Sequence, residues 1–167
     1  MILKEKILFS KEECEYIISY NDTHITNWIM GDRKFDSQPI RYSLETKWLF
    51  DKLKTFFEEE SNIQIKKNKE VIHFHKFTKG DWFGKHNDVR DNRLYAVGVL
   101  LSDDFEGGDF KLYNRNEIAL NKVLGNTYLF DTRIDHEITP ILNGERYSLL
   151  WFLQNEHINP LETNKLI

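Results

Sequence analysis

Three residues of this chain have the types that commonly bind a transition metal: His86, Asp88 and His136. His86 and Asp88 are two positions apart, so in an extended segment their side chains leave the same face of the chain. His136 follows fifty residues later in a segment that reads as a strand, and it can supply a third ligand. Two imidazoles and one carboxylate leave coordination positions open, which suits iron(II) with a bound cosubstrate and oxygen.

The residues around this triad carry more information than the triad itself, because an isolated His-x-Asp pair also occurs in ordinary surface loops. Phe77, Gly80, Phe83 and His86 follow one another at steps of three. Gly80 allows a tight turn, and we expect Phe83 to pack beneath the segment that carries the ligands.

This pattern resembles the 2-oxoglutarate- and iron(II)-dependent dioxygenases, and within them the prolyl-4-hydroxylase-like group. That group has Tyr-x-x-Gly-x-x-Phe/Tyr-x-x-His-x-Asp, then a strand opened by Arg and closed by Gly-Gly. A distal His follows, with Lys or Arg ten residues after it. The match spans about residues 71 to 153 and consists of Phe77, Gly80, Phe83, His86, Asp88, Arg93, Gly107, Gly108, His136 and Arg146.

The resemblance implies a hydroxylase that consumes 2-oxoglutarate and O2 and releases succinate and CO2, with ascorbate as a stimulant. It implies His86, Asp88 and His136 as the Fe(II) ligands. It assigns Arg146 to the distal carboxylate of 2-oxoglutarate, and a planar guanidinium does grip a carboxylate through two parallel hydrogen bonds. Ser148 lies on the same strand face as Arg146, so its hydroxyl is expected to share that carboxylate.

One position departs from the pattern of the group. The chain has Phe77 where tyrosine is usual, and the hydroxyl that commonly helps to hold 2-oxoglutarate is missing. Tyr128 is the preferred replacement, with Tyr95 and Ser148 as alternatives.

The substrate is less well defined than the iron site. The resemblance favours a prolyl residue in a peptide or protein, or a free amino acid. Arg133 is equally well explained as part of an ion pair, and Trp151 fits the core better than the pocket. His73 and His75 form a rival pair of ligands, but two packed histidines are the favoured interpretation. The candidates for the pocket wall and rim are Trp82, Asn87, Arg90, Arg133, His75 and Trp151.

Two other functions compete with hydroxylation. Repair demethylases of nucleic acid in the superfamily have a second arginine six residues after the first, and here that position is Phe152. The net charge of −4 and the scattered basic residues also disfavour nucleic acid, since the run at Lys66–Lys69 reads as a solvated turn. A jelly roll that binds metal or ligand without turnover is the other alternative, and Phe77 is the residue that supports it.

The elements that must position the site change character along the chain. Ser10 and Glu13 form a capping-box pattern that predicts a helix, and a second helix is predicted from about Ser43. The segment from Thr23 to Arg41 is left unassigned. From about Ile63, short apolar runs alternate with turn signals. The predicted strands are Val71–Phe77, Leu94–Leu101, Asp109–Tyr113, Thr127–Phe130, Ile134–Ile141 and Arg146–Leu153.

These elements predict a mainly β fold with flanking α-helices. The core is expected to be a double-stranded β-helix, a jelly roll of the cupin type, with the N-terminal helices packed outside it. We expect a single domain over residues 1–167, with a helical part over about 1–62 and the jelly roll over about 63–155.

Composition sets the compartment that we expect. Cys14 is the single cysteine, so no internal disulfide is possible. The charged start, Met1–Lys6, is unlike a signal peptide, and no apolar run reaches the length of a membrane span. A cytoplasmic protein without a membrane partner is therefore expected.

Overall fold

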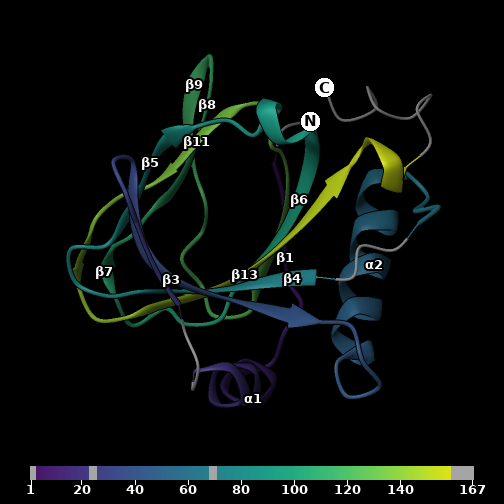
Figure 1. Ribbon diagram of the computed structural model, residues 1–167, viewed down its shortest axis with the longest axis horizontal. Coiled ribbons are helices and arrows are strands. Elements are labelled where there is room, and N and C mark those ends of the chain that lie inside the picture. Colours follow the sequence, from purple (N-terminus) through teal and green to yellow (C-terminus); the bar gives the residue numbers. More distant parts are fainter. Residues whose placement is uncertain (1–2, 23–25, 68–70, 159–167) are drawn as a thin grey trace.

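The largest element of the fold is one antiparallel sheet, which curls into an incomplete barrel (Figure 1). The computed structural model describes residues 3–22, 26–67 and 71–158, so part of the expected Lys66–Lys69 turn lies outside the described residues. The helices are α1 (Lys11–Asn21) and α2 (Lys47–Ser61), with 3-10 turns η1 (Val89–Asp91) and η2 (Asn155–His157). The strands are β1 (Leu3–Ile7), β2 (Thr26–Met30), β3 (Arg33–Arg41), β4 (Val71–Phe77), β5 (Trp82–His86), β6 (Arg93–Leu100), β7 (Glu106–Gly107), β8 (Phe110–Asn114), β9 (Asn116–Ala119), β10 (Asn126–Asp131), β11 (Asp135–Ile138), β12 (Ile141–Asn143) and β13 (Arg146–Gln154).

The strand order brings distant segments together. Among the described residues the main sheet runs β1-β10-β6-β13-β4-β3-β5-β11-β8-β9, with β2 paired to β3. Strands β12 and β7 form a separate two-stranded sheet. This arrangement confirms the double-stranded β-helix that the sequence predicts.

Successive side chains of a strand point to opposite faces of the sheet, so apolar residues form one core inside the barrel and a second outside it. On β13, Leu150 and Phe152 pack inside the barrel, whereas Leu149 and Trp151 pack outside it. The inner core is largely aromatic. Its central members are Phe35, Phe77, Phe105, Phe110, Tyr128, Phe130 and Phe152.

The two helices cover the outside of the barrel (Figure 1). Helix α1 begins at the predicted capping box, in which the backbone N–H of Glu13 donates to Ser10 and the Glu13 carboxylate accepts from the Ser10 N–H. Helix α2 buries a stripe of apolar side chains against the outer core. That stripe consists of Leu49, Phe50, Leu53, Phe56 and Phe57.

The expectation of a helical N-terminal part is wrong for three segments, because β1, β2 and β3 also lie within residues 1–62. Strand β1 pairs with β10 at one end of the main sheet, and its charged sequence is typical of an edge strand. Strand β3 contains Pro39, which usually argues against a strand. Pro39 is tolerated because this part of β3 pairs only with β4 in the described structure.

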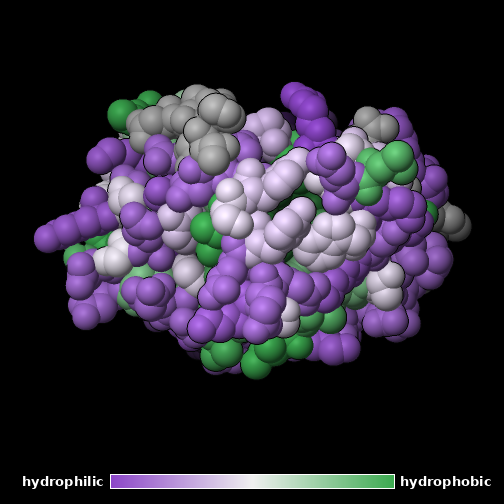
Figure 2. Space-filling model, turned by 90° about the horizontal axis from the view of Figure 1, so that it is seen from below, coloured by the Kyte–Doolittle hydropathy of each residue, from purple (hydrophilic) through white to green (hydrophobic). Residues whose placement is uncertain are grey.

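The face that carries α1 lies away from β5 and β11 (Figure 1). It is mostly hydrophilic, with a group of pale, weakly polar side chains near its middle (Figure 2). Tyr16 and Tyr20 of α1 stack at 6.0 Å between ring centroids, and the ring of Trp48 of α2 lies 6.3 Å from that of Tyr16. Among the described residues, no helix is both long and apolar enough to cross a membrane.

Candidate metal centre

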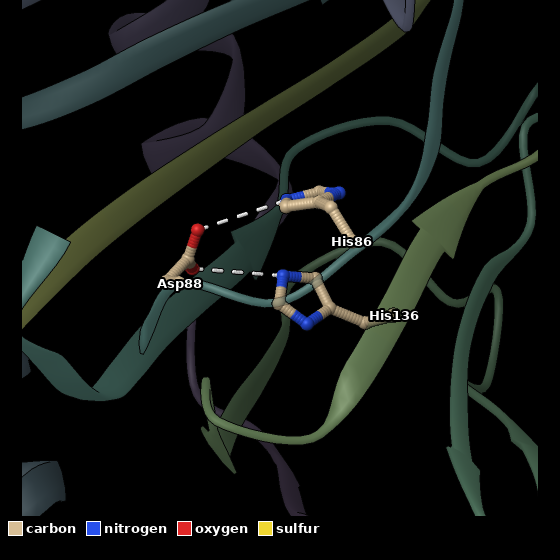
Figure 3. Close-up of side chains that lie close together, drawn as sticks. All are labelled: His86, Asp88 and His136. Atoms are coloured by element: carbon tan, nitrogen blue, oxygen red, sulfur yellow. Dashed lines mark ion pairs between the residues drawn. The ribbon is translucent and has the colours of Figure 1, made fainter. Parts of the chain in front are cut away.

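The three predicted ligands lie together at the end of two paired strands (Figure 3). His86 is the last residue of β5 and is directly opposite His136 of β11. Asp88 follows β5 at the start of η1, where the backbone is no longer extended. The prediction that His86 and Asp88 share a face of one extended segment is therefore wrong for Asp88. The turn after His86 aims the carboxylate at both imidazoles, whose Nε2 atoms lie 3.8 and 3.6 Å from its two oxygens.

Each imidazole is oriented by its own backbone. The Nδ1 of His86 donates to the carbonyl oxygen of Gly84, and the Nδ1 of His136 donates to that of Ile134, both at 2.7 Å. A carbonyl oxygen only accepts, so the proton of each neutral ring is on Nδ1. The lone pair of each Nε2 is left to face Asp88, as metal binding requires.

The Asp88 carboxylate is held in a buried position with one oxygen unsatisfied. The backbone N–H of Asp88 donates to the carbonyl oxygen of Thr132 at 2.9 Å, and Nη1 of Arg93 lies 3.5 Å from Oδ1 of Asp88. Oδ2 is buried, and no described residue forms a hydrogen bond with it. A buried carboxylate oxygen is rarely left in this state unless an ion completes it. The three side chains therefore fit a divalent cation.

Aromatic rings pack against the two candidate histidine ligands. A register shift in the β5–β11 ladder allows Phe83 and His86, three residues apart, to share a face. Their rings stack at 3.9 Å, which confirms the expected packing of Phe83. Phe35 of β3 continues the stack, with centroids 5.3 Å from Phe83 and 4.8 Å from Phe77. Burial among such rings lowers the pKa of His136, which favours the neutral, metal-binding form.

Arg146 is a buried cation whose described partners are all neutral. It is 1% exposed, and its Nε and Nη1 donate to the Gly108 carbonyl and the Ser148 hydroxyl at 3.0 and 2.9 Å. Its third partner is the Tyr128 hydroxyl. Asp109, the neighbouring carboxylate, forms an ion pair with Lys122 at 3.2 Å. A buried guanidinium without a carboxylate is costly, and a dicarboxylate ligand would supply one.

Two of the three other residues predicted to bind the cosubstrate lie beside Arg146, and the third does not. Ser148 and Tyr128 lie beside Arg146, and Gly98 makes room for the Tyr128 ring, since a Cβ there would approach that ring to 2.2 Å. The prediction that Tyr95 helps to hold the cosubstrate is wrong. It packs in the outer core, 6.0 Å from Phe57 of α2, because neighbouring residues of β6 face opposite sides of the sheet.

The predicted substrate residues are more scattered. Trp151 lies in the outer core, so its assignment to the pocket is wrong. Arg133 is held by Asp131 through two contacts of 2.8 Å, which is the ion pair considered as its alternative. Trp82 precedes Phe83 and so leaves the opposite face of β5. Asn87 and Arg90 are exposed near the metal ligands, and Asn87 donates to Asp135 at 2.9 Å.

His75 is the one predicted substrate residue that lies inside the barrel. It is directly opposite Ser148, its ring is 4.7 Å from that of Phe35, and it is 5% exposed. Burial, with the positive charges of His73 and Arg146 adding to it, lowers the pKa of His75 well below its usual value. This side chain is therefore neutral at physiological pH.

Two residues at the site were not predicted to have these roles. Phe35 falls in the unassigned segment, and nothing in the alternation there marks it as central. Arg93 belongs to the sequence pattern, yet its contact with Asp88 and its position 3.8 Å above the Phe152 ring appear only in three dimensions.

Family comparison agrees with this geometry. The model of the 2OG-Fe(II) oxygenase superfamily matches residues 72–154, which contain the triad and Arg146. Among curated proteins, none matches the sequence significantly. The chain belongs to the 2OG-Fe(II) oxygenase superfamily and is a 2-oxoglutarate-dependent dioxygenase, with Fe(II), 2-oxoglutarate and O2 as the implied cofactor and cosubstrates.

Solved structures share the fold at low identity. A prolyl hydroxylase from Trichoplax adhaerens, in complex with a hypoxia inducible factor peptide, is 18% identical with a TM-score of 0.75, covering 92% of this chain and 84% of its own. A prolyl-4-hydroxylase from Pseudomonas putida is 16% identical with a TM-score of 0.72, covering 92% of both chains. The epimerase SnoN of nogalamycin biosynthesis is 9% identical with a TM-score of 0.69, covering 91% of this chain and 77% of its own.

Proposed function

We propose that this dioxygenase hydroxylates a proline residue within a peptide or protein. The observation that carries the proposal is an open, amide-rich hollow lined by Asn92, Gln154, Asn155 and Glu156. Gln154 pairs in register with Arg93, and Arg93 contacts Asp88, so the hollow is connected to the metal ligands through one residue.

The chemistry of this hollow suits a peptide better than a free amino acid. Side-chain amides carry both donors and acceptors, which match the N–H and C=O groups of an extended backbone. The buried ring of Phe152 lies under Arg93 and 5.6 Å from His73, so the surroundings of Arg93 are aromatic. The prolyl hydroxylases among the similar structures support the same substrate class.

The residues divide the work of such a reaction. His86, Asp88 and His136 would hold Fe(II), which when bound supplies the activation of oxygen. Arg146, Ser148 and Tyr128 would hold and orient 2-oxoglutarate through its distal carboxylate. The aromatic inner core would limit the access of water to the reacting groups.

A turnover screen tests the proposal. Succinate release and hydroxylated product would be measured with Fe(II), 2-oxoglutarate and ascorbate over proline-containing peptides, free proline, other amino acids and methylated nucleotides. We expect product from the peptides, with weaker or no turnover of free proline. Product from a free amino acid alone, or from a methylated nucleotide, would overturn the assignment.

The alternatives have weaker support. Phe152 fills the position of the second arginine of repair demethylases, and its ring packs against Arg93. A binding module without turnover would show no succinate in air while still forming the metal complex. The cytoplasmic location and the stimulation by ascorbate stay predictions.

A further inference from the structure

His75 has an unmet hydrogen-bonding atom inside the barrel. Its Nδ1 is buried and lacks a partner, a state shared among the described side chains by Gln38, Asp88 and Thr132. For Asp88 the unmet atom lies at the metal site. Buried polar atoms are normally satisfied, so an atom of this kind inside a binding barrel indicates a ligand that supplies the missing bond.

The surroundings of His75 define what that ligand would be. His75 lies opposite Ser148, and Ser148 accepts a hydrogen bond from Arg146. Because the imidazole is neutral, it carries one N–H donor and one acceptor. A neutral donor complements an anion here, because the buried cation beside it has no carboxylate partner among the described residues.

The neighbouring position explains why a donor is needed here. Phe77 is two residues further along β4, directly opposite Arg146, and its ring is stacked on Phe35. Its phenyl ring has no hydroxyl to offer. The ring of His75 also packs on Phe35 and lies 6.2 Å from that of Phe77, so this imidazole lies next to the position where the hydroxyl is missing.

We propose that His75 donates a hydrogen bond to a carboxylate oxygen of bound 2-oxoglutarate and so replaces the tyrosine hydroxyl that Phe77 lacks. This inference rests on the cosubstrate site described above. It assigns His75 to the cosubstrate, and a contact with the prime substrate becomes an outcome of the test.

Equilibrium binding of 2-oxoglutarate to the Mn(II)-loaded protein, measured by calorimetry, provides the test. We expect His75→Phe to weaken 2-oxoglutarate binding roughly 10- to 100-fold, the range for one hydrogen bond to a charged group. His75→Asn keeps a donor on a short side chain and is expected to lose less. His73→Phe, on the same strand face, is the matched control and should bind like the native chain. If His75→Phe does not fold, His75→Leu replaces it.

A compensating substitution sharpens the result. Phe77→Tyr should restore 2-oxoglutarate binding in the His75→Phe chain while changing the native chain little. Unchanged 2-oxoglutarate affinity in His75→Phe, or an effect confined to the KM of the peptide, would overturn the role of His75 alone. Failure of the native Mn(II)-loaded chain to bind 2-oxoglutarate would instead overturn the cosubstrate site itself. Mn(II) affinity and thermal unfolding, measured on every variant, separate these outcomes from misfolding.

Discussion

Arg146 and Gly108 are joined by a hydrogen bond of 3.0 Å between the guanidinium Nε and the backbone carbonyl oxygen. Gly108 has φ +60, and a Cβ there would lie 2.2 Å from Cδ1 of Ile141 and 3.2 Å from Cδ of Arg146. The Gly-Gly pair of the sequence pattern thus has a physical reason. It lets the backbone approach the arginine closely enough to fix its direction.

Replacing Gly108 by alanine should therefore impair both stability and cosubstrate binding. Gly80→Ala is the matched control, because Gly80 has φ +88 but open space around its Cβ position. We expect about 1–2 kcal/mol of destabilisation from backbone strain alone at Gly80. Gly108→Ala should cost about 1–3 kcal/mol more from overpacking. Urea unfolding measures the difference, and equal losses would contradict this account.

Asp88→Asn should abolish metal binding without unfolding the chain. The substitution keeps the shape of the side chain and removes the charge that the metal requires. We expect Fe(II) or Mn(II) affinity to fall by more than about 100-fold, since even the loss of an outer partner costs about 10- to 100-fold. Asp91→Asn removes the other carboxylate near Arg93, at 3.4 Å, and serves as the control. Native-like metal affinity in Asp88→Asn would show that the ligand assignment is wrong.

Arg146→Gln should separate the cosubstrate from the metal. The loss of a buried charged pair with a carboxylate is expected to weaken 2-oxoglutarate binding about 100-fold. The affinity for the metal should change little, because Arg146 does not contact the triad in the described structure. Arg133→Gln removes a guanidinium already paired with Asp131 and should leave 2-oxoglutarate binding intact. Parallel losses of both affinities in Arg146→Gln would count against its role.

The metal-free protein should lose stability in mild acid partly through His75. Its pKa in the folded state is well below the usual 6.5, so below that pH the unfolded chain takes up a proton that the folded chain does not. Stability present above pH 6.5 is therefore lost as the pH falls, by up to about 1.4 kcal/mol per pH unit for one group. Urea unfolding from pH 7 to 5 should show a shallower decline in His75→Phe. The same slope in both proteins would contradict this.

The grouping of His86, Asp88 and His136 could be predicted because candidate ligands are marked by residue type and fixed spacing. The strands that hold them are also predictable from apolar alternation, although the predicted Ile134–Ile141 strand divides into β11 and β12. A strand at the edge of the sheet is harder to predict from the sequence, because it packs against fewer neighbours. The sequence of β1 is charged because it forms an edge, and it shows little apolar alternation.

The predictions that were wrong at the site assigned a residue to the wrong face of its strand. Arg146 faces inward, so Trp151, five residues later on the same strand, must face outward. That parity was available from the sequence. The role of Phe35 was not, because it depends on β3 lying between β4 and β5, and this order is set by long-range pairing.

The two backbone carbonyls that accept from Nδ1 of His86 and His136 affect how the site would gain and lose its metal ion. Both rings already have the tautomer and direction that an ion needs before any ion arrives. Loading then requires little rearrangement, and removing the ion leaves the pocket in place. A chain stripped by a chelator should accordingly regain its metal on simple addition of Fe(II), with no cycle of unfolding and refolding.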